Sequence, residues 1–363
     1  SGWGATAIRC TAAGANQTVD LTVDRPEFIG IARAAHVTRG RQIRALNLRA
    51  SGMRSSIFYI GGVVADGRSY DIEVANCEVT NCGSFVTTAE SSLAVFAYAD
   101  NIRITGGINR ASGNAAHSSQ AHVVYLRSAT DVLIDGLRSP DGHAGGALVH
   151  INAEATEVRN SDIRLLNMQV AGVSTYHAIR ATRTDGLVVR GGYLRDTYSA
   201  PINVDASSQL SIEDMDIRDG NRVGLSNPIS TSAIYLVTVN DWSVKGARGY
   251  GDSPGATTYG MGRFVYASQC GHGVIEDSRM STKAGVTAYY FLDLGTSAGR
   301  IKMRRVKADR LSSIVNNSAV AAAGSELEDC IATSMTSGWA VPDAGRWAAY
   351  DVLYNGTQEV AAR

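Results

Sequence analysis

His150 is the residue of this 363-residue chain whose type best suits acid–base chemistry near neutral pH. An imidazole titrates close to neutrality, so it can take or give a proton there. Tyr125 precedes it in the sequence, and Arg180 follows it at a similar interval. A phenol can protonate a leaving oxygen, and a guanidinium such as that of Arg180 or Arg127 can neutralise a carboxylate and ease removal of the proton beside it. Asp205 is the acidic member of the same series.

Each of these residues lies in a short stretch in which apolar and other side chains alternate. The alternation has a period of two, which is typical of a strand with one buried face. The stretches recur at similar intervals along the chain and are 95–98, 124–127, 149–152, 177–180, 202–205 and 234–237. The sequence therefore predicts one strand that is repeated along the chain and that carries the candidate residues.

A second strand-like motif recurs between these stretches, usually with a polar residue before an alternating apolar pair. Its copies are 42–46, 71–74, 101–104, 131–134, 162–165, 186–189, 209–212 and 241–244. The steps between successive copies lie within the range of about 20–50 residues that is typical of solenoid repeats. Such a step is too short for a separate domain and suits one coil of a solenoid. Leucine-rich repeats need a fixed Leu/Asn consensus and propeller blades need about four strands per unit, so neither fits.

Two strand series with one rhythm predict an all-β fold, a single-domain right-handed parallel β-helix of about ten coils. We expect residues 41–335 to form the β-helix. Residues 1–40 precede the clear repeat and are expected to cap its first edge, which would otherwise invite pairing with another strand. Residues 336–363 break the pattern and are expected to form a C-terminal cap or tail.

Composition narrows the class of protein further. Lys and Arg total 34 and so do Asp and Glu, and this zero net charge argues against a nucleic-acid partner, which would favour a basic excess. Charged residues make up 19% and hydrophobic residues 44%, which excludes a disordered chain. No apolar run is long enough to span a membrane. The five cysteines are odd in number and include no Cys-x-x-Cys, so neither zinc nor a disulfide framework is expected.

Stacked coils bring side chains that are far apart in the sequence into columns about 4.8 Å apart. In the repeated strand that carries His150, one apolar pair is expected to face inward and the alternate residues outward. The first outward column is then Phe96, Tyr125, His150, Ala178, Asn203 and Tyr235, and the second is Tyr98, Arg127, Asn152, Arg180, Asp205 and Val237. These columns predict one strip of surface that carries the candidate catalytic residues.

Segments between the strands vary in length and are rich in Gly, Ser and Asn, so they are expected to be loops. Examples are 138–146, 219–232 and 249–262, and loops on one side of a solenoid commonly build its binding face. The first example contains Asp141-Gly142-His143 and leads directly into the strand of His150. We therefore expect His143 to border the same groove, while Asp141 fits a simple Asp-Gly turn. His117, His122 and His177 lie nearby in the sequence, without a pattern that separates ligands from packing.

The coil period and strand pattern of residues 41–335 resemble those of the pectate-lyase-like parallel β-helix superfamily. That group includes secreted polysaccharide lyases, polygalacturonase-type hydrolases, uronate epimerases and phage tailspike depolymerases. The resemblance concerns the strand pattern and not a shared catalytic motif, and a fold alone does not give the reaction. It implies a polysaccharide ligand.

On this resemblance we expect an extracellular polysaccharide depolymerase, a lyase that cleaves a uronate-containing glycan by β-elimination. His150 would be the acid–base group, Tyr125 would protonate the leaving oxygen and Arg180 would neutralise the carboxylate, with Asp205 as the acidic member of the catalytic set. Exposed aromatic rings stack on sugars, and Arg, Asn and Asp hydrogen-bond hydroxyls and carboxylates. The expected substrate-binding set is Tyr98, Arg127, Asn152, His143, Asn203 and Tyr235.

Three alternatives stay open. A phage tailspike-type glycoside hydrolase acting on capsule or lipopolysaccharide would need two carboxylates about 5 to 10 Å apart, for which Asp205, Glu154 and Asp293 are the candidates. A uronate epimerase would need the same base, acid and neutraliser, although a Tyr-Gly-Phe-Asp-Pro-His run expected of that class is missing. A glycan-binding β-helix would need the strip without catalysis.

No metal site or other cofactor is expected, because the strip has no dense cluster of the carboxylates that calcium needs. The expected partner is a polysaccharide substrate, with no nucleic acid and no membrane span. Tailspike-type proteins are trimers as a class, so the resemblance also allows a homotrimer. Its members are secreted or virion-associated, which implies an extracellular location.

Overall fold

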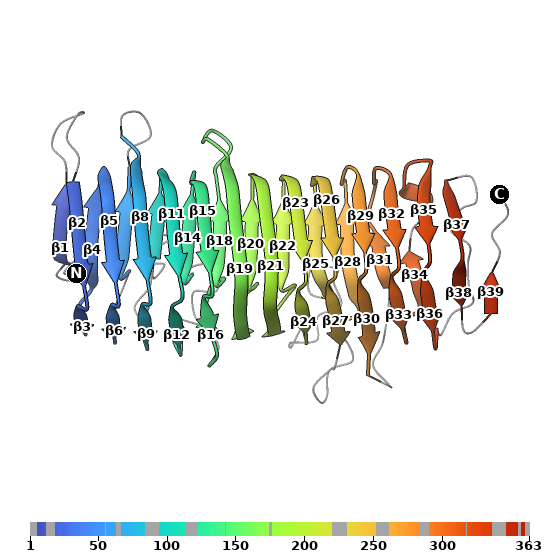
Figure 1. The fold of residues 1–363 in the computed structure, drawn as a ribbon, viewed down its shortest axis with the longest axis horizontal. Coiled ribbons are helices and arrows are strands. Elements are labelled where there is room, and N and C mark those ends of the chain that lie inside the picture. Colours follow the sequence, from blue (N-terminus) through green and yellow to red (C-terminus); the bar gives the residue numbers. More distant parts are fainter. Residues whose placement is uncertain are drawn as a thin grey trace. The chain divides into compact units, whose positions relative to one another are not determined.

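The structure is a computed structural model of the 363-residue chain. It describes residues 6–11, 19–54, 56–62, 67–83, 94–113, 122–141, 143–173, 176–219, 231–251, 261–283, 290–316, 318–335, 346–354 and 357–359. The chain forms two compact units, Ser1–Leu187 and Val188–Arg363, and each is described by itself. Strands dominate both units (Figure 1).

The first unit contains two series of stacked parallel strands. The first series consists of β1 (Thr6–Thr11), β4 (Arg33–Thr38), β7 (Phe58–Gly61), β10 (Ala94–Ala97), β14 (Val124–Arg127), β18 (Val149–Asn152) and β20 (Ile179–Thr182). The second series consists of β2 (Val19–Asp24), β5 (Gly40–Leu46), β8 (Ser69–Ala75), β11 (Ala99–Thr105), β15 (Thr130–Asp135) and β19 (Asn160–Val173). Shorter strands continue the second series in each coil and are β3 (Glu27–Ile29), β6 (Arg49–Ser51), β9 (Glu78–Thr80), β12 (Ile108–Arg110), β13 (Ser112–Gly113), β16 (Arg138–Ser139) and β17 (His143–Ala144).

The second unit repeats this arrangement, and β21 (Thr184–Thr197) leads into it. Its first series consists of β22 (Ile202–Asp205), β25 (Ser232–Val237), β28 (Arg263–Ser268), β31 (Tyr290–Leu294) and β34 (Ser313–Asn316). Its second series consists of β23 (Ser208–Glu213), β26 (Asn240–Lys245), β29 (Gly273–Glu276), β32 (Ile301–Arg304), β35 (Ser325–Glu328) and β37 (Trp347–Tyr350). The shorter strands are β24 (Asp216–Arg218), β27 (Arg248–Gly251), β30 (Arg279–Thr282), β33 (Lys307–Asp309), β36 (Ile331–Thr333) and β38 (Val352–Tyr354).

The repeated residue that opens the second motif has a defined backbone role. It takes a left-handed conformation, with φ between 50° and 72°, in Gln42, Asp71, Asn101, Asp131, Asp162, Gly186, Gln209 and Asp241. Asn and Asp tolerate this region better than most residues, and Gly has no Cβ to oppose it. Strand pairing passes over the residue, since Asp100 pairs with Thr130 and Ile102 with Val132. The motif therefore encodes a bend near the start of each strand of the second series.

Inward side chains of the strands pack into an apolar core. In the first unit, Ile102, Val132 and Ile163 stack in consecutive coils and are fully buried. In the second unit, the core contains the indole of Trp242, and Gly273 lies opposite it on the next strand. A Cβ on Gly273 would come within 2.1 Å of the indole, so the absence of a side chain there makes room for Trp242. Each buried branched residue contributes on the order of 1.5–3 kcal/mol, so the core stabilises the register of the coils.

The two ends of the chain take part in the stacking. β1, β2 and β3 lie in parallel register with β4, β5 and β6 of the next coil. β37 and β38 pair in parallel with β35 and β36, and β39 (Thr357–Glu359) returns antiparallel to β38. The stacked strands thus extend beyond the limits predicted at residues 41 and 335, and the capping role of the two end segments stays a prediction.

The predicted all-β parallel β-helix of about ten coils is confirmed by this arrangement. The predicted loops at 219–232 and 249–262 fall largely outside the described residues. All five cysteines are free thiols, and Cys82, Cys270 and Cys330 are buried. In the part of the chain that the structure describes, no helix has the length and apolar character needed to cross a membrane.

Replacing Gln209 tests the left-handed position of the repeat. Its side chain is exposed and its φ is 54°. Gln209→Val should lower the free energy of unfolding by about 1–2 kcal/mol, because a β-branched residue opposes a left-handed backbone. Gln209→Gly is the matched control and should stay close to the parent chain. Urea unfolding followed by circular dichroism measures both, and equal stability of the two variants would contradict the role of this position.

Candidate functional site

Most candidate residues of the first unit lie on three neighbouring strands, β14, β18 and β20. Strand pairing places Tyr125 opposite His150 and His150 opposite Arg180, so these three residues form one column. Arg127 lies opposite Asn152 in the adjacent column. Parallel strands are about 4.8 Å apart, so each group of a column is within reach of the next. The structure thus brings the phenol, the imidazole and the guanidinium together.

The register of β10 differs from the sequence-based columns. Val95 lies opposite Tyr125, whereas Phe96 lies opposite Leu126 and is fully buried. The alternation of the sequence had predicted that Phe96 faces outward. Val95 and Phe96 are both apolar, so alternation alone could not decide which of them faces inward.

The register of β20 also differs from the predicted one, by two residues. Arg180 lies opposite His150, in the place that the sequence analysis gave to Ala178. Ala178 precedes β20 and is fully buried. The correction moves Arg180 out of the column of Arg127 and puts its positive charge directly beside the imidazole.

His150 is hydrogen-bonded to a second histidine, His122, which lies just before β14. Nδ1 of His150 and Nε2 of His122 are 2.6 Å apart, and the backbone N–H of Ala147 donates to Nδ1 of His122 at 2.8 Å. Because an amide N–H can only donate, Nδ1 is the unprotonated nitrogen of His122. Neutral His122 therefore donates its Nε2–H to Nδ1 of His150, and neutral His150 carries its own proton on Nε2.

Aromatic and cationic groups surround this histidine. The ring centroids of His150 and Tyr125 are 5.2 Å apart. Tyr176 lies 4.7 Å from the ring of His177, and the guanidinium of Arg180 lies 5.4 Å from the Tyr176 ring centre. His150 is 9% exposed and His177 is 4% exposed. The imidazoles are therefore largely withdrawn from water, beside a cation that rests on an aromatic face.

These surroundings lower the pKa of His150 from 6.5 to about 3. Burial is the largest cause, and the charges of Arg180 and His177 act in the same direction. The hydrogen bond from His122 adds a geometric reason, because a proton on Nδ1 would set two N–H groups against each other. His150 is thus neutral at pH 7 and presents Nε2–H as a donor.

This geometry does not favour the proton-accepting role that the sequence suggested for His150. The only lone pair in the plane of its neutral ring lies on Nδ1 and accepts the hydrogen bond from His122. His150 is suited to donating a hydrogen bond and orienting a ligand. Tyr125, its neighbour in the column, is the remaining group there that can exchange a proton.

Arg127 belongs to a network with two carboxylates. Its Nε and Nη2 donate to Oε1 of Glu157 at 2.8 and 2.5 Å, and Nη2 donates to Oε1 of Glu154 at 2.8 Å. Tyr98 follows β10 with a φ of 53° and donates its hydroxyl to the same oxygen of Glu157. Burial alone would raise the pKa of Glu157, but hydrogen bonds from Arg127, Tyr98 and the backbone of Glu154 outweigh it and lower the pKa to about 2.

The predicted substrate-binding residues Tyr98, Arg127 and Asn152 lie beside the column, and they differ in whether Glu157 already holds them. Tyr98 and Arg127 are held by Glu157, so the charge of Arg127 is already balanced. Asn152 is closer to the column, because its Nδ2 donates to the hydroxyl of Tyr125 across 3.5 Å, a long hydrogen bond. Of the three, Asn152 is best placed to orient a group that reacts at Tyr125.

His143 does not lie on the strip. It belongs to β17, where it pairs with Ser112 of β13 and Val173 of β19 in the second strand series. Its side chain is 2% exposed, and its Nδ1 lies 3.5 Å from Nδ2 of Asn109. The expectation that His143 borders the groove was wrong, because closeness to His150 in the sequence did not reflect the sheet to which it belongs.

The second unit carries the predicted residues Asn203, Asp205 and Tyr235. Asn203 lies opposite Tyr235, which lies opposite Tyr266 of β28. The rings of Tyr235 and Tyr266 are parallel within 4°, with their centroids 5.0 Å apart. Burial raises the pKa of Tyr235, and the neighbouring Tyr266 and Asp205 act in the same direction. This pair of stacked phenols offers aromatic edges and hydroxyl groups of the kind that contact sugars.

A buried ion pair follows in the column of Tyr266. Asp293 lies opposite Tyr266 and is 3% exposed. Arg263 donates its Nε to Oδ2 of Asp293 at 2.6 Å, and Asn316 donates its Nδ2 to Oδ1 at 2.7 Å. Arg263 also donates to the hydroxyl of Thr231. Both carboxylate oxygens of Asp293 are thus engaged inside the protein.

The histidine cluster contains residues that the sequence analysis did not assign. His122 and His177 each lie two residues before their strands, β14 and β20, and Ala147 lies at the same place before β18. This common position is a signal that the sequence contains, but its value depends on knowing where each strand begins. Tyr176 and Glu157 lie outside the repeated strands and carried no such signal. In the described part of the chain, no group of three or more His, Cys, Asp or Glu is arranged to hold a metal ion.

Comparison with solved structures identifies the class of fold. The A-module of the mannuronan C-5 epimerase AlgE6 from Azotobacter vinelandii has a TM-score of 0.50 at 11% identity, over 93% of this chain and 92% of that chain. A mutant tailspike protein of E. coli bacteriophage HK620 has a TM-score of 0.49 at 10% identity, over 93% of this chain and 60% of that chain. The surface adhesin PfbA of Streptococcus pneumoniae has a TM-score of 0.48 at 10% identity, over 90% and 86%.

The chain has the parallel β-helix fold that the strand pattern indicated. No protein-family model matches the chain, and no curated protein sequence matches it. At 11% identity, the similarity to the epimerase module shows the fold alone.

The protonation of His150 can be measured directly by imidazole ¹H–¹⁵N correlation spectra. Neutral His150 with its proton on Nε2 is expected from about pH 8 down to about pH 4, because burial, Arg180 and His177 oppose the charged form. The neutral ring of His122 is expected to carry its proton on Nε2, because its Nδ1 accepts the backbone hydrogen bond of Ala147. An imidazolium at His150 near its ordinary pKa of 6.5 would contradict the described pair.

Stability should depend on pH in a way that His150 controls. The unfolded chain takes up a proton on this side chain near pH 6.5, whereas the folded chain resists protonation until about pH 3. The free energy of unfolding should therefore be highest above pH 6.5 and fall as the pH drops towards 3. Urea unfolding between about pH 5 and pH 7 should show a weaker fall in His150→Gln than in the parent chain. Identical slopes would contradict the buried neutral state.

Proposed function

We propose that the chain is an extracellular polysaccharide lyase that cleaves a uronate-containing glycan by β-elimination on the face of β14, β18 and β20. The observation that carries the proposal is the column of Tyr125, His150 and Arg180 on three consecutive strands. A phenol, a neutral imidazole donor and a guanidinium in this order combine a proton-exchanging group with groups that bind a carboxylate.

Arg180 supplies the positive charge in this proposal. A guanidinium beside the uronate carboxylate stabilises the negative charge that develops when the proton on the neighbouring carbon, C5, is removed. The Nε2–H of His150 donates a second hydrogen bond to the substrate, since this nitrogen keeps its proton at pH 7. Both groups stabilise the negative charge that develops in the transition state. Stabilisation of the transition state accelerates the step.

Tyr125 exchanges the proton. As a phenolate it takes the proton from C5, the released electron pair forms the C4–C5 double bond, and the bond from C4 to the glycosidic oxygen breaks. The phenol then returns the proton to the leaving oxygen, so Tyr125 ends in the form in which it began. Asn152 orients the phenol oxygen through its Nδ2.

Hydrolysis has less support from the described contacts. Of the carboxylates considered for it, Glu154 pairs with Arg127 and Asp293 pairs with Arg263. Asp205, expected in the catalytic set, lies in the second unit, opposite Val237 of β25. A retaining or inverting hydrolase needs two carboxyl groups that are available to the substrate.

The second unit contributes sugar contacts in the proposal. Asn203, Tyr235 and Tyr266 form one column, and their amide and phenol groups would hydrogen-bond sugar hydroxyls there. The name of the epimerase module identifies a uronate polymer, mannuronan, as its substrate, which agrees with an acidic glycan. C-5 epimerisation begins with the same removal of a proton, so the product decides between the two reactions.

An extracellular or virion-associated location goes with this proposal, because a lyase of this kind meets its polysaccharide outside the cell. A homotrimer is the candidate assembly. Sedimentation equilibrium tests the assembly, and a monomer at micromolar concentration would remove the homotrimer from the proposal.

Incubation with uronate polymers tests the reaction. β-Elimination creates a C4–C5 double bond conjugated with the carboxylate, so the ultraviolet absorbance of the unsaturated product should rise as the polymer shortens. Shortening without this absorbance would replace elimination with hydrolysis. Inversion at C5 without shortening would replace it with epimerisation.

Two substitutions test the column. Tyr125→Phe should lower kcat by about 10²–10⁴-fold, because it removes the proton-exchanging oxygen and leaves the ring. Arg180→Lys should raise KM and lower kcat, because an ammonium cannot make the planar two-point contact with a carboxylate. Tyr193→Phe is the matched control, since Tyr193 lies in the second strand series, and should leave both constants unchanged. Full activity of Tyr125→Phe would contradict the proposed step.

A further inference from the structure

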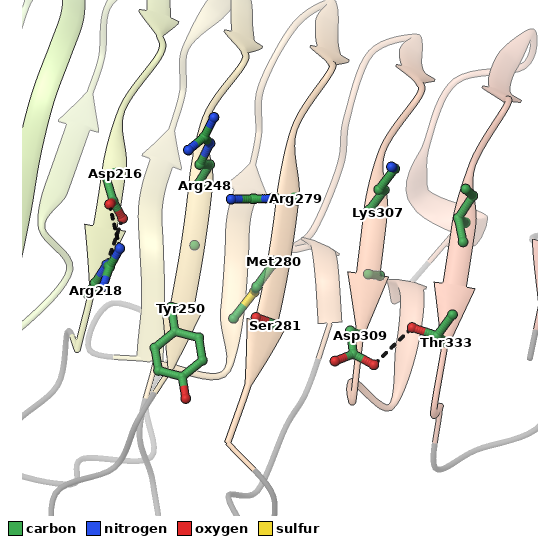
Figure 2. Close-up of a pocket in the computed structure, with 13 residues that line it drawn as sticks. Asp216, Arg218, Arg248, Tyr250, Arg279, Met280, Ser281, Lys307, Asp309 and Thr333 are labelled. Carbon is green, nitrogen blue, oxygen red and sulfur yellow. Dashed lines mark hydrogen bonds and ion pairs between the residues drawn. The ribbon is translucent and has the colours of Figure 1, made fainter.

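A groove on the second unit lies away from the residues discussed so far. Its volume is about 510 Å³, and it is lined by residues of β24, β27, β30, β33 and β36 (Figure 2). These strands belong to the second series, whereas Asn203 and Tyr235 lie in the first. No step of the proposed reaction uses this groove.

Three cations form a row along the groove. Arg248 lies opposite Arg279, and Arg279 lies opposite Lys307, on the consecutive strands β27, β30 and β33. Figure 2 shows the three side chains on the same side of these strands. All three are exposed. Like charges directly opposite one another on neighbouring strands repel, so this row is unfavourable in the absence of an anion.

The row differs from other cations of the same unit. Within the described residues, none of its members forms an ion pair or a side-chain hydrogen bond. By contrast, Arg218 pairs with Asp216 at 2.8 Å, and Arg305 pairs with Asp277 at 2.6 Å. Arg218 and Arg305 are thus held by acids of the protein, whereas the three cations of the row are not held by any acid that the structure describes.

The acids of the groove are already engaged. Asp216 accepts both hydrogen bonds of its pair with Arg218. Asp309 pairs with Arg310 at 2.9 Å and accepts a hydrogen bond from the hydroxyl of Thr333 at 2.9 Å (Figure 2). A second depression of about 560 Å³ adjoins the row, and it is also lined by Asp214, Asp277 and Asp329, of which Asp277 is held by Arg305. The charge that the groove offers to a ligand is therefore that of the three cations of the row.

The floor of the groove adds a surface suited to sugars. Tyr250 lies opposite Arg218 on one side and Ser281 on the other, and its ring is half-buried. Figure 2 shows Tyr250 and Met280 below the row of cations. An aromatic ring beside hydroxyl and cationic groups is the combination that holds an acidic sugar, since the ring packs on the sugar face and the cations take its charge.

We propose that this groove is a second, non-catalytic site for an acidic polysaccharide, whose anionic groups bind Arg248, Arg279 and Lys307 while Tyr250 packs against a sugar ring. The cations recur about every 4.8 Å, a step comparable with one sugar of an extended chain. A polysaccharide is favoured over a nucleic acid because the chain as a whole has no basic excess. The choice of uronate as the anionic sugar rests on the proposed function, whereas the row itself does not.

The test measures binding by calorimetry in a Tyr125→Phe/Arg180→Gln background, which does not cut the ligand and lacks the cation of the candidate active site. The probes are mannuronan and polygalacturonate, with neutral dextran and duplex DNA for comparison. Arg248→Gln/Arg279→Gln/Lys307→Gln removes the row. Arg25→Gln/Arg41→Gln/Arg49→Gln is the matched control, since it removes three exposed arginines of the first unit that form no ion pair or side-chain hydrogen bond with the described residues.

Removal of the row should weaken uronate binding about ten-fold at low salt, with a smaller effect at high salt, and the control should change it less than about two-fold. Equal losses in both triple variants would overturn the proposal, as would equal binding of dextran. Duplex DNA that binds as tightly as the uronate polymers would overturn the assignment to a polysaccharide. If the parent chain cuts no glycan and row-dependent binding is still found, the proposed function fails and the groove site stands.

Discussion

Parallel stacking of strands in register is the constraint on which the functional surfaces depend. Backbone hydrogen bonds between coils fix neighbouring strands about 4.8 Å apart, so residues separated by a whole coil of the chain become direct neighbours. The column of Tyr125, His150 and Arg180 arises in this way in the first unit. The row of Arg248, Arg279 and Lys307 arises in the same way in the second. A shift of one residue in one coil would turn such a group to the opposite face.

The chemistry open to each outward residue depends on the ion pairs and hydrogen bonds that it already forms with its neighbours. Arg127 pairs with two carboxylates, and one of them, that of Glu157, also accepts a hydrogen bond from Tyr98. Arg180 instead lies beside a neutral imidazole and an aromatic ring. The ion pairs of Arg127 support the scaffold of the strip, whereas Arg180 is the cation that we propose contacts the ligand.

The parallel β-helix could be predicted from the sequence because its signal is repeated. The polar residue of the second motif and the alternating pair after it recur in coil after coil, and the left-handed conformations of Asp71, Asn101 and Asp131 explain why that residue type is used. The column of Tyr125 and His150 followed from the same period. Repetition averages out the ambiguity of any single strand.

The rest of the site could not be predicted because it depends on single contacts. The positions of Phe96 and Ala178 were wrong, since apolar neighbours make either register plausible in one coil. His143 was wrong because the sequence does not show which sheet a two-residue strand joins. The hydrogen bond from His122 determines which nitrogen of neutral His150 carries the proton. It joins residues 28 positions apart, and only coordinates reveal it.

In the proposed reaction, the column on β14, β18 and β20 holds the glycan at the bond that is cleaved. A crystal structure of Tyr125→Phe with a bound oligouronate tests it most directly. We expect a uronate carboxylate within hydrogen-bond distance of Arg180 and of Nε2 of His150, with C5 facing the ring at position 125. An oligosaccharide bound elsewhere on the protein, with this column left open to solvent, would contradict it.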